Sequence, residues 1–75
     1  MIPYKNIDGD SGVSAYENGA DYIKVKFSTG SIYTYTYKSA GSENIEHMKI
    51  LAQSGEGLNA FINESVKKLY ARKEC

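Results

Sequence analysis

The side chains best suited to chemistry lie near the middle of the chain, where three of its seven tyrosines alternate with threonines. Side chains two residues apart on a strand point to the same face of a sheet. Tyr33, Tyr35 and Tyr37 would therefore share one face, while Thr34 and Thr36 would share the other. Such a row of phenols is either an aromatic layer of the core or a platform on which bases can stack.

The register of one predicted hairpin decides between these two readings. Residues 21–28 alternate apolar and polar side chains, which predicts a half-buried strand. A two-residue loop after this strand would place the tyrosines opposite Lys24 and Lys26. A three-residue loop that ends in a left-handed glycine would place them opposite Ile23 and Val25. We favour the three-residue loop because it gives one apolar face and one polar face.

In this register Tyr33 and Tyr35 belong to the core, and the opposite face carries a strip of basic and hydroxyl groups. A nucleic-acid backbone could lie on that strip, although a merely solvated face is the simpler interpretation. Asn59 stands among apolar residues, where it either caps a helix, bonds a strand edge or binds a ligand. The candidate binding residues are Lys24, Lys26, Thr34, Thr36, Tyr33, Tyr35 and Asn59.

Residues for catalysis or metal binding are sparse. His47 is the one histidine, and no Cys, His or Asp spacing around it resembles a metal site. Asp8, Asp10 and Ser11 are close in sequence but have no histidine near them. We therefore expect no catalytic residue, no metal and no cofactor, and we expect the protein not to be an enzyme.

Two glycine-rich or basic segments suggest anion binding, but each has a simpler interpretation. Gly55 and Gly57 precede a helix, yet the segment lacks the lysine of a phosphate-binding loop, which favours a turn between helices. The second segment clusters four cations near the C-terminus, and such a cluster usually complements a helix dipole. These cations are Lys67, Lys68, Arg72 and Lys73.

The predicted fold class is α+β, with a three-stranded antiparallel β-meander and two C-terminal helices packed on one face. The expected segments are a loose arm over 1–10, strands over 13–16, 21–28 and 31–37, a linker over 38–41, and helices over 42–54 and 58–72. Ser42 is the expected N-cap of the first helix. The first hairpin stays open between one register that turns Tyr16 inward and another that turns Val13 and Ala15 inward.

The 75 residues are expected to form one domain spanning 1–75. Nine basic and nine acidic residues cancel, which argues against strong non-specific binding to nucleic acid. The one cysteine, at the last position, cannot form an internal disulfide. Residues 1–10 hold no apolar run typical of a signal peptide, and no segment is apolar enough to span a membrane, so we expect a cytoplasmic protein.

The ordered motifs resemble the KTSC domain, a small domain named after the C-terminus of some lysyl-tRNA synthetases. The matching motifs are Phe27-x-x-Gly30-x-x-Tyr33-x-Tyr35, Ala52-x-Ser54-Gly55-x-Gly57-Leu58-Asn59-x-Phe61-Ile62 and a late Tyr70. The resemblance covers residues 11–70. Many members of the family carry Val-Pro after the second tyrosine, whereas this chain continues Thr36-Tyr37-Lys38-Ser39.

The resemblance implies a stand-alone bacterial or phage protein of uncharacterised role, with RNA as the suggested ligand. We therefore expect a small non-enzymatic binding module. The alternative is a protein-interaction or inhibitory module of phage or mobile-element origin, which the neutral charge would suit. The oligomeric state stays open.

Overall fold

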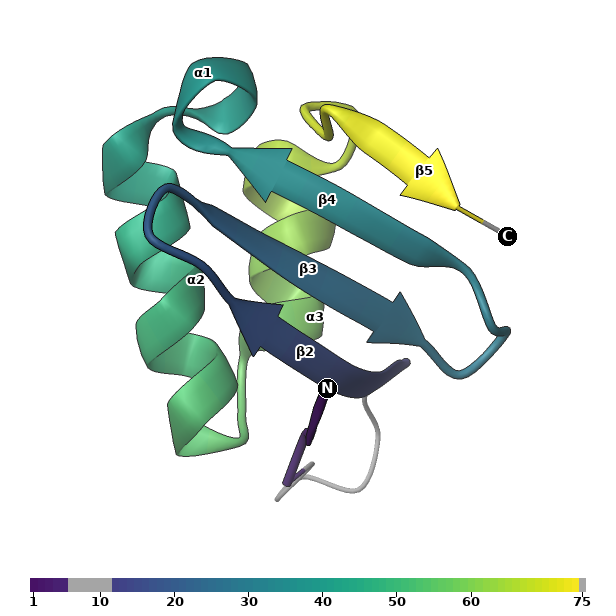
Figure 1. Ribbon diagram of the computed structural model, residues 1–75. Coiled ribbons are helices and arrows are strands. Elements are labelled where there is room, and N and C mark those ends of the chain that lie inside the picture. The colour runs from purple at the N-terminus through teal and green to yellow at the C-terminus, as the bar shows by residue number, and fades with distance from the viewer. Residues whose placement is uncertain (6–11, 75) are drawn as a thin grey trace.

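The computed structural model describes residues 1–5 and 12–74, and it shows an antiparallel sheet of five strands with helices on one face (Figure 1). The strands follow the order β1-β2-β3-β4-β5 across the sheet. They are β1 (Ile2–Pro3), β2 (Val13–Asn18), β3 (Tyr22–Phe27), β4 (Ile32–Thr36) and β5 (Arg72–Glu74). The helices are α1 (Tyr37–Ala40), α2 (Ser42–Ser54), α3 (Leu58–Phe61) and a π-helical continuation, η1 (Ile62–Val66). The expected α+β class and antiparallel sheet are confirmed, with two more strands and one more helix than predicted.

The hairpin of β3 and β4 has the register that we favoured. Val25 lies opposite Tyr33, and Ile23 lies opposite Tyr35. The three-residue loop 28–30 ends in Gly30, whose φ of +97° is accessible to glycine at little cost. The tyrosines therefore face the helices, and Lys24 and the threonines face away from them.

The first hairpin settles the question that the sequence left open. Tyr16 pairs with Val25 and points to the helices. A bulge between Val13 and Ala15 inserts one extra residue, which shifts the alternation of the strand. Val13 and Tyr16 therefore both face the helices and are buried, although they are three residues apart.

The start of the chain is attached to the sheet, whereas we expected a loose arm over 1–10. Strand β1 pairs with β2, and the side chain of Tyr4 is buried. The Tyr4 hydroxyl accepts a hydrogen bond from the backbone N–H of Leu58 at 3.3 Å. The large apolar ring and its buried partner explain why this short segment docks. The rest of the expected arm, residues 6–10, lies outside the described residues.

The chain end also differs from the sequence prediction, which continued the second helix to Arg72. Helical structure ends at Val66, and the chain returns as β5 along β4. The backbone N–H of Ala71 donates to the carbonyl oxygen of Thr34 at 2.7 Å and begins this pairing. The returning strand gives the backbone groups at the outer edge of β4 hydrogen-bond partners that a longer helix would have left to solvent.

The connection between sheet and helices is a capped turn where the sequence suggested a linker. The Thr36 hydroxyl accepts from the N–H of Ser39, and the Ser39 hydroxyl accepts from the N–H of Thr36, both at 3.0 Å. This capping box starts α1 and takes Tyr37 out of the strand. Ser42 lies inside α2, whose N-cap is Gly41, so the prediction of Ser42 as N-cap was wrong.

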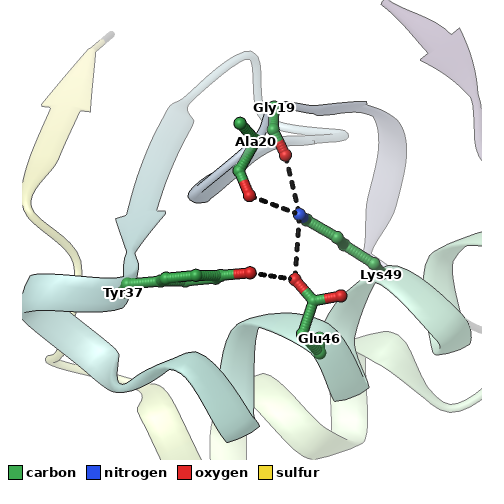
Figure 2. Close-up of polar contacts among 5 residues, drawn as sticks. All are labelled: Gly19, Ala20, Tyr37, Glu46 and Lys49. Atoms are coloured by element: carbon green, nitrogen blue, oxygen red, sulfur yellow. Dashed lines mark hydrogen bonds and ion pairs between the residues drawn. The ribbon is translucent and has the colours of Figure 1, made fainter.

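A polar cluster fixes α2 to the turn between β2 and β3 (Figure 2). The Lys49 ammonium donates to the carbonyl oxygens of Gly19 at 2.7 Å and Ala20 at 3.3 Å, and to the Glu46 carboxylate at 3.0 Å. The Tyr37 hydroxyl donates to the same Glu46 oxygen at 2.5 Å. The Tyr37 hydrogen bond and then the Lys49 hydrogen bond lower the pKa of Glu46, and the bond to Glu46 raises the pKa of Tyr37.

The core fills the space between the sheet and the helices. The apolar stripe predicted for 42–54 supplies Ile45, Met48 and Ala52, all almost fully buried. The last helical segment adds buried residues along one of its faces, as an amphipathic helix does. These residues are Leu58, Ile62 and Val66, and each follows the one before it by four residues.

Candidate functional site

A groove of about 420 Å³ opens between the helix-facing side of the sheet and the segment that runs from α3 through η1 to the start of β5. Four aromatic rings form most of its walls, namely Phe27, Tyr33, Tyr35 and Tyr70. Strands β3 and β4 provide the first three, and the segment that follows η1 provides Tyr70. The groove exists because the chain between η1 and β5 brings Tyr70 against Tyr33 and Tyr35 before β5 pairs with the edge of β4.

The rings in the groove meet mainly edge to face. Tyr33 contacts Phe27 with ring centroids 5.3 Å apart and planes at 89°, and it contacts Tyr70 at 4.9 Å and 80°. Tyr33 and Tyr35 are nearly parallel, with centroids 6.4 Å apart. Tyr70 is 38% exposed and forms the outer wall. The walls therefore present both ring faces and ring edges to an incoming planar group.

Tyr35 is the most buried of the four aromatic residues that line the groove. Tyr35 is only 1% exposed, and its hydroxyl makes no hydrogen bond with any part of the chain that the structure describes. Among the described residues, the side-chain atom that is fully buried and has no partner is Asn18 Oδ1, and not the Tyr35 hydroxyl. The Tyr35 hydroxyl therefore keeps access to solvent through the groove. Burial, followed by the nearby Tyr33 and Tyr70, raises the pKa of Tyr35 to about 12.

The helical wall carries amides and amines. Asn59, Asn63 and Lys67 are four residues apart, and all three line the groove together with Lys68. The ammonium of Lys73, on β5, lies 5.5 Å from the centroid of the Tyr33 ring. Among the residues that the structure describes, no acidic side chain lines this groove. The site therefore combines aromatic walls with positive charge.

The structure brings together three of the seven predicted binding residues in this groove: Tyr33, Tyr35 and Asn59. Tyr35 is buried as expected, whereas Tyr33 is half-buried and forms a wall of the groove. Asn59 does not cap α3, because the N-cap is Gly57 and no side chain bonds the helix start. The other four predicted residues lie away from the groove.

Those four residues form only part of a basic strip on the helix-free face of the sheet. Lys24 and Thr34 lie opposite each other in neighbouring strands, and Lys26 lies opposite Ile32 on the same face. The hydroxyl of Thr36 takes part in the capping box of α1. Contrary to the prediction, it is therefore not free to bind a ligand. A phosphate could therefore meet at most the two lysines and one threonine of the predicted set.

Carboxylates also interrupt this face. Glu17 lies opposite Lys24 on the β2 side, and Arg72 lies opposite Thr34 on the β5 side. Arg72 forms an ion pair with Glu74, with Nε and Oε1 3.4 Å apart. Alternating charges of this kind produce a weak net field beyond a Debye length.

Sequence reasoning missed the contributions of Asn63, Lys67 and Tyr70 to the groove. The spacing of 59, 63 and 67 was the signal that could have found Asn63 and Lys67, because residues four apart lie on one helix face. The π-helical turn is a second signal, although it is visible only in the structure, and such turns are frequent at functional sites.

The expectations about His47 and metals can also be compared with the structure. His47 is exposed, and its ring packs against Phe61 with centroids 4.7 Å apart. Over the described residues, no group of three or more potential ligands could hold a metal ion. Over the same residues, the helices are too short or too polar to cross a bilayer.

Comparison of the chain with models of protein families, with curated proteins and with solved structures finds no match.

Proposed function

We propose that the protein is a non-enzymatic binding module that holds single-stranded RNA, with the aromatic groove as its main contact. The observation that carries this proposal is the meeting of four aromatic rings and two lysines in one groove. Aromatic side chains that stack on bases contribute about 1–3 kcal/mol per base, and they tolerate any sequence. The resemblance to the KTSC domain family points to the same ligand.

The groove suits a single strand better than a duplex. Bases of a duplex are already stacked on each other, whereas an unpaired base can enter a pocket lined with aromatic rings. Lys67 and Lys68 stand beside the rings, where they can contact phosphates of the same strand. The absence of net charge on the chain fits an interaction in which stacking contributes more than charge.

The groove is a better location for the main contact than the strip on the opposite face. Its lining among the described residues lacks carboxylates, whereas Glu17 and Glu74 share the opposite face with the cations of the strip. Lys24 and Lys26 remain candidates for a secondary contact with a longer strand. The two faces can be separated experimentally because each carries its own pair of lysines.

Fluorescence anisotropy with a labelled single-stranded RNA of about ten nucleotides, at low and moderate salt, tests the proposal. The variant K67Q/K68Q should weaken binding about tenfold. The loss of two phosphate contacts should also reduce the slope of log K against log salt concentration by roughly 1.4. The matched variant K24Q/K26Q removes the same charge from the opposite face and should bind within about twofold of the wild type.

Two results would contradict the proposal. A larger loss in K24Q/K26Q than in K67Q/K68Q would move the RNA contact to the strip. No anisotropy change at tens of micromolar protein and low salt would remove RNA as the ligand.

A protein-interaction or inhibitory module is the second candidate. Met1 and Ile2 are adjacent in sequence and are 49% and 52% exposed, so together they offer a small apolar surface for a contact. Replacing both with serine should leave RNA binding unchanged. The same replacement would abolish any self-association detected by light scattering if this segment is an interface.

A further inference from the structure

The size of the groove limits how much ligand it can hold. Its volume of about 420 Å³ lies at the lower end of the range for pockets that enclose one small organic molecule. Tyr70 closes the outer side against Tyr33, so the aromatic walls do not extend into a continuous platform. The groove therefore has room for one planar ring with its substituents, and not for a stack of several bases.

The Tyr35 hydroxyl is available to a hydrogen-bonding ligand. The Tyr35 side chain is almost entirely buried, but its hydroxyl keeps access to solvent and needs a hydrogen-bond partner, which the protein, water or a ligand can supply. The Tyr35 hydroxyl has none in the described part of the chain, although it borders the groove. It can donate one hydrogen bond and accept another. Its raised pKa, about 12, keeps it a donor throughout the physiological range.

The two amides supply a second set of donors and acceptors. Asn59 and Asn63 are one helical turn apart and both line the groove. Each amide offers a carbonyl acceptor and an NH₂ donor, which together match the mixed edge of a nucleobase. A purely apolar ring would leave these groups and the Tyr35 hydroxyl without partners, at a cost in affinity.

The cations lie further along the same wall. Lys67 follows Asn63 by four residues and directly follows the end of η1, so the polar groups change from amide to amine toward the end of this segment. Lys73 adds a third positive charge beside the Tyr33 ring. An occupant that matches this order is aromatic, carries hydrogen-bonding groups at one end and is anionic at the other.

We infer that the groove binds one nucleotide at a time, with the base against the aromatic wall, its edge at Tyr35 and Asn59, and its phosphate at Lys67 and Lys68. This inference rests on the proposed function and narrows it, because it states that a single nucleotide unit is the recognised element. The bound unit is then an end or a splayed-out base of an RNA strand. A free nucleoside monophosphate carries all the groups that the groove contacts.

An NMR titration of the ¹⁵N-labelled protein with the four nucleoside 5′-monophosphates tests the inference. We expect shifts at Tyr35, Asn59, Asn63 and the backbone of Lys67 for at least one monophosphate, with the four bases differing several-fold in Kd. The corresponding nucleoside should bind at least about fivefold more weakly, because it lacks the phosphate that the lysines contact. Inorganic phosphate alone should leave the signals of Tyr35 unchanged.

The variant Tyr35→Phe isolates the hydroxyl. It should weaken the best monophosphate by about three- to tenfold, the usual effect of one neutral hydrogen bond, and should reduce the difference among the four bases. Tyr22→Phe is the matched control, because the Tyr22 hydroxyl bonds Glu17 on the opposite face of the sheet. The control should bind like the wild type. The mapping on wild-type protein needs no variant, so it decides the location even where a variant folds poorly.

The outcomes separate this inference from the function on which it rests. Binding of the RNA strand without any shift from 10 mM monophosphate would overturn the single-nucleotide site and leave the RNA-binding proposal standing. Shifts confined to Lys24 and Lys26, or equal shifts from inorganic phosphate, would also overturn it. Equal affinity of Tyr35→Phe and the wild type would refute the role of the hydroxyl. No binding of either strand or monophosphate would overturn both proposals.

Discussion

Replacement of Lys49 with methionine should destabilise the protein, because one ammonium group holds the turn between β2 and β3 against α2 (Figure 2). The Lys49 side chain is only 14% exposed, and its bond to the Gly19 carbonyl oxygen is 2.7 Å long. A hydrogen bond from a charged group contributes about 1.5–3 kcal/mol. The longer bond to the exposed Ala20 adds little. We therefore expect Lys49→Met to lower the free energy of unfolding by about 1.5–2.5 kcal/mol.

Urea unfolding followed by circular dichroism measures this loss, and the melting temperature should fall by roughly 6–20 °C. Gln53→Met is the matched control, because Gln53 lies one turn further along α2 and is exposed. It places the same side chain on the same helix without removing the anchor. The control should stay within about 0.5 kcal/mol of the wild type.

The pKa of Glu46 provides a second readout that does not depend on unfolding. The bonds from Tyr37 and Lys49 lower this pKa in the wild type, so it should rise in Lys49→Met and in Tyr37→Phe. A Lys49→Met variant as stable as the Gln53→Met control, with the pKa of Glu46 unchanged, would refute the reasoning. In that case the turn would be held by the strand pairing alone.

Three further predictions concern stability. Burial raises the pKa of Tyr35 to about 12 in the folded state, above an unfolded value near 10. The free energy of unfolding should therefore fall as pH rises from 10 to 12, by at most about 2.7 kcal/mol. Tyr35→Phe should flatten this decline in alkaline unfolding curves. Gly30→Ala should cost about 1–2 kcal/mol in urea unfolding through its positive φ alone, since an added Cβ meets nothing within 4 Å. Gly19→Ala should cost more, because its Cβ would come within 2.0 Å of a neighbouring tyrosine ring. Equal losses in the two variants would contradict this. Ile45→Ala should cost about 2–5 kcal/mol, because Ile45 is fully buried. Ile50→Ala should cost less than about 0.5 kcal/mol, because Ile50 is 64% exposed on the same helix. Calorimetric melting of the two variants checks this difference.

The parts of the fold that depend on local chemistry could be predicted from the sequence. Alternation in 21–28 and a glycine at the end of a three-residue loop were enough to place Tyr33 and Tyr35 on the side of the helices. The apolar stripe of α2 was likewise readable from its period. The resemblance to the KTSC domain stays a prediction.

The parts that depend on distant pairing could not be predicted. The segment Arg72–Glu74 has little β propensity of its own, and it becomes a strand because β4 offers an unpaired edge. The bulge before Ala15 inserts one residue without any glycine to mark it. Both features depend on partners far away in the sequence, which local patterns do not encode.

Only part of the candidate site could be predicted from the sequence, for the same reason. Tyr33, Tyr35 and Asn59 were each named as candidates, but nothing local showed that they meet. Lys67 was assigned to a helix dipole because the helix was expected to continue past it. Once the chain turns back at Val66, the lysines that follow become part of a groove wall.

The two outermost strands affect how the protein behaves when it is concentrated. Strand β1 is two residues long and includes Pro3, which has no N–H to offer a neighbouring chain, and β5 consists of three charged residues. Both rims of the sheet are thus poor templates for adding further strands, in the manner by which fibrils grow. A sheet left bare on one face can therefore stay dispersed at the millimolar concentrations used in NMR.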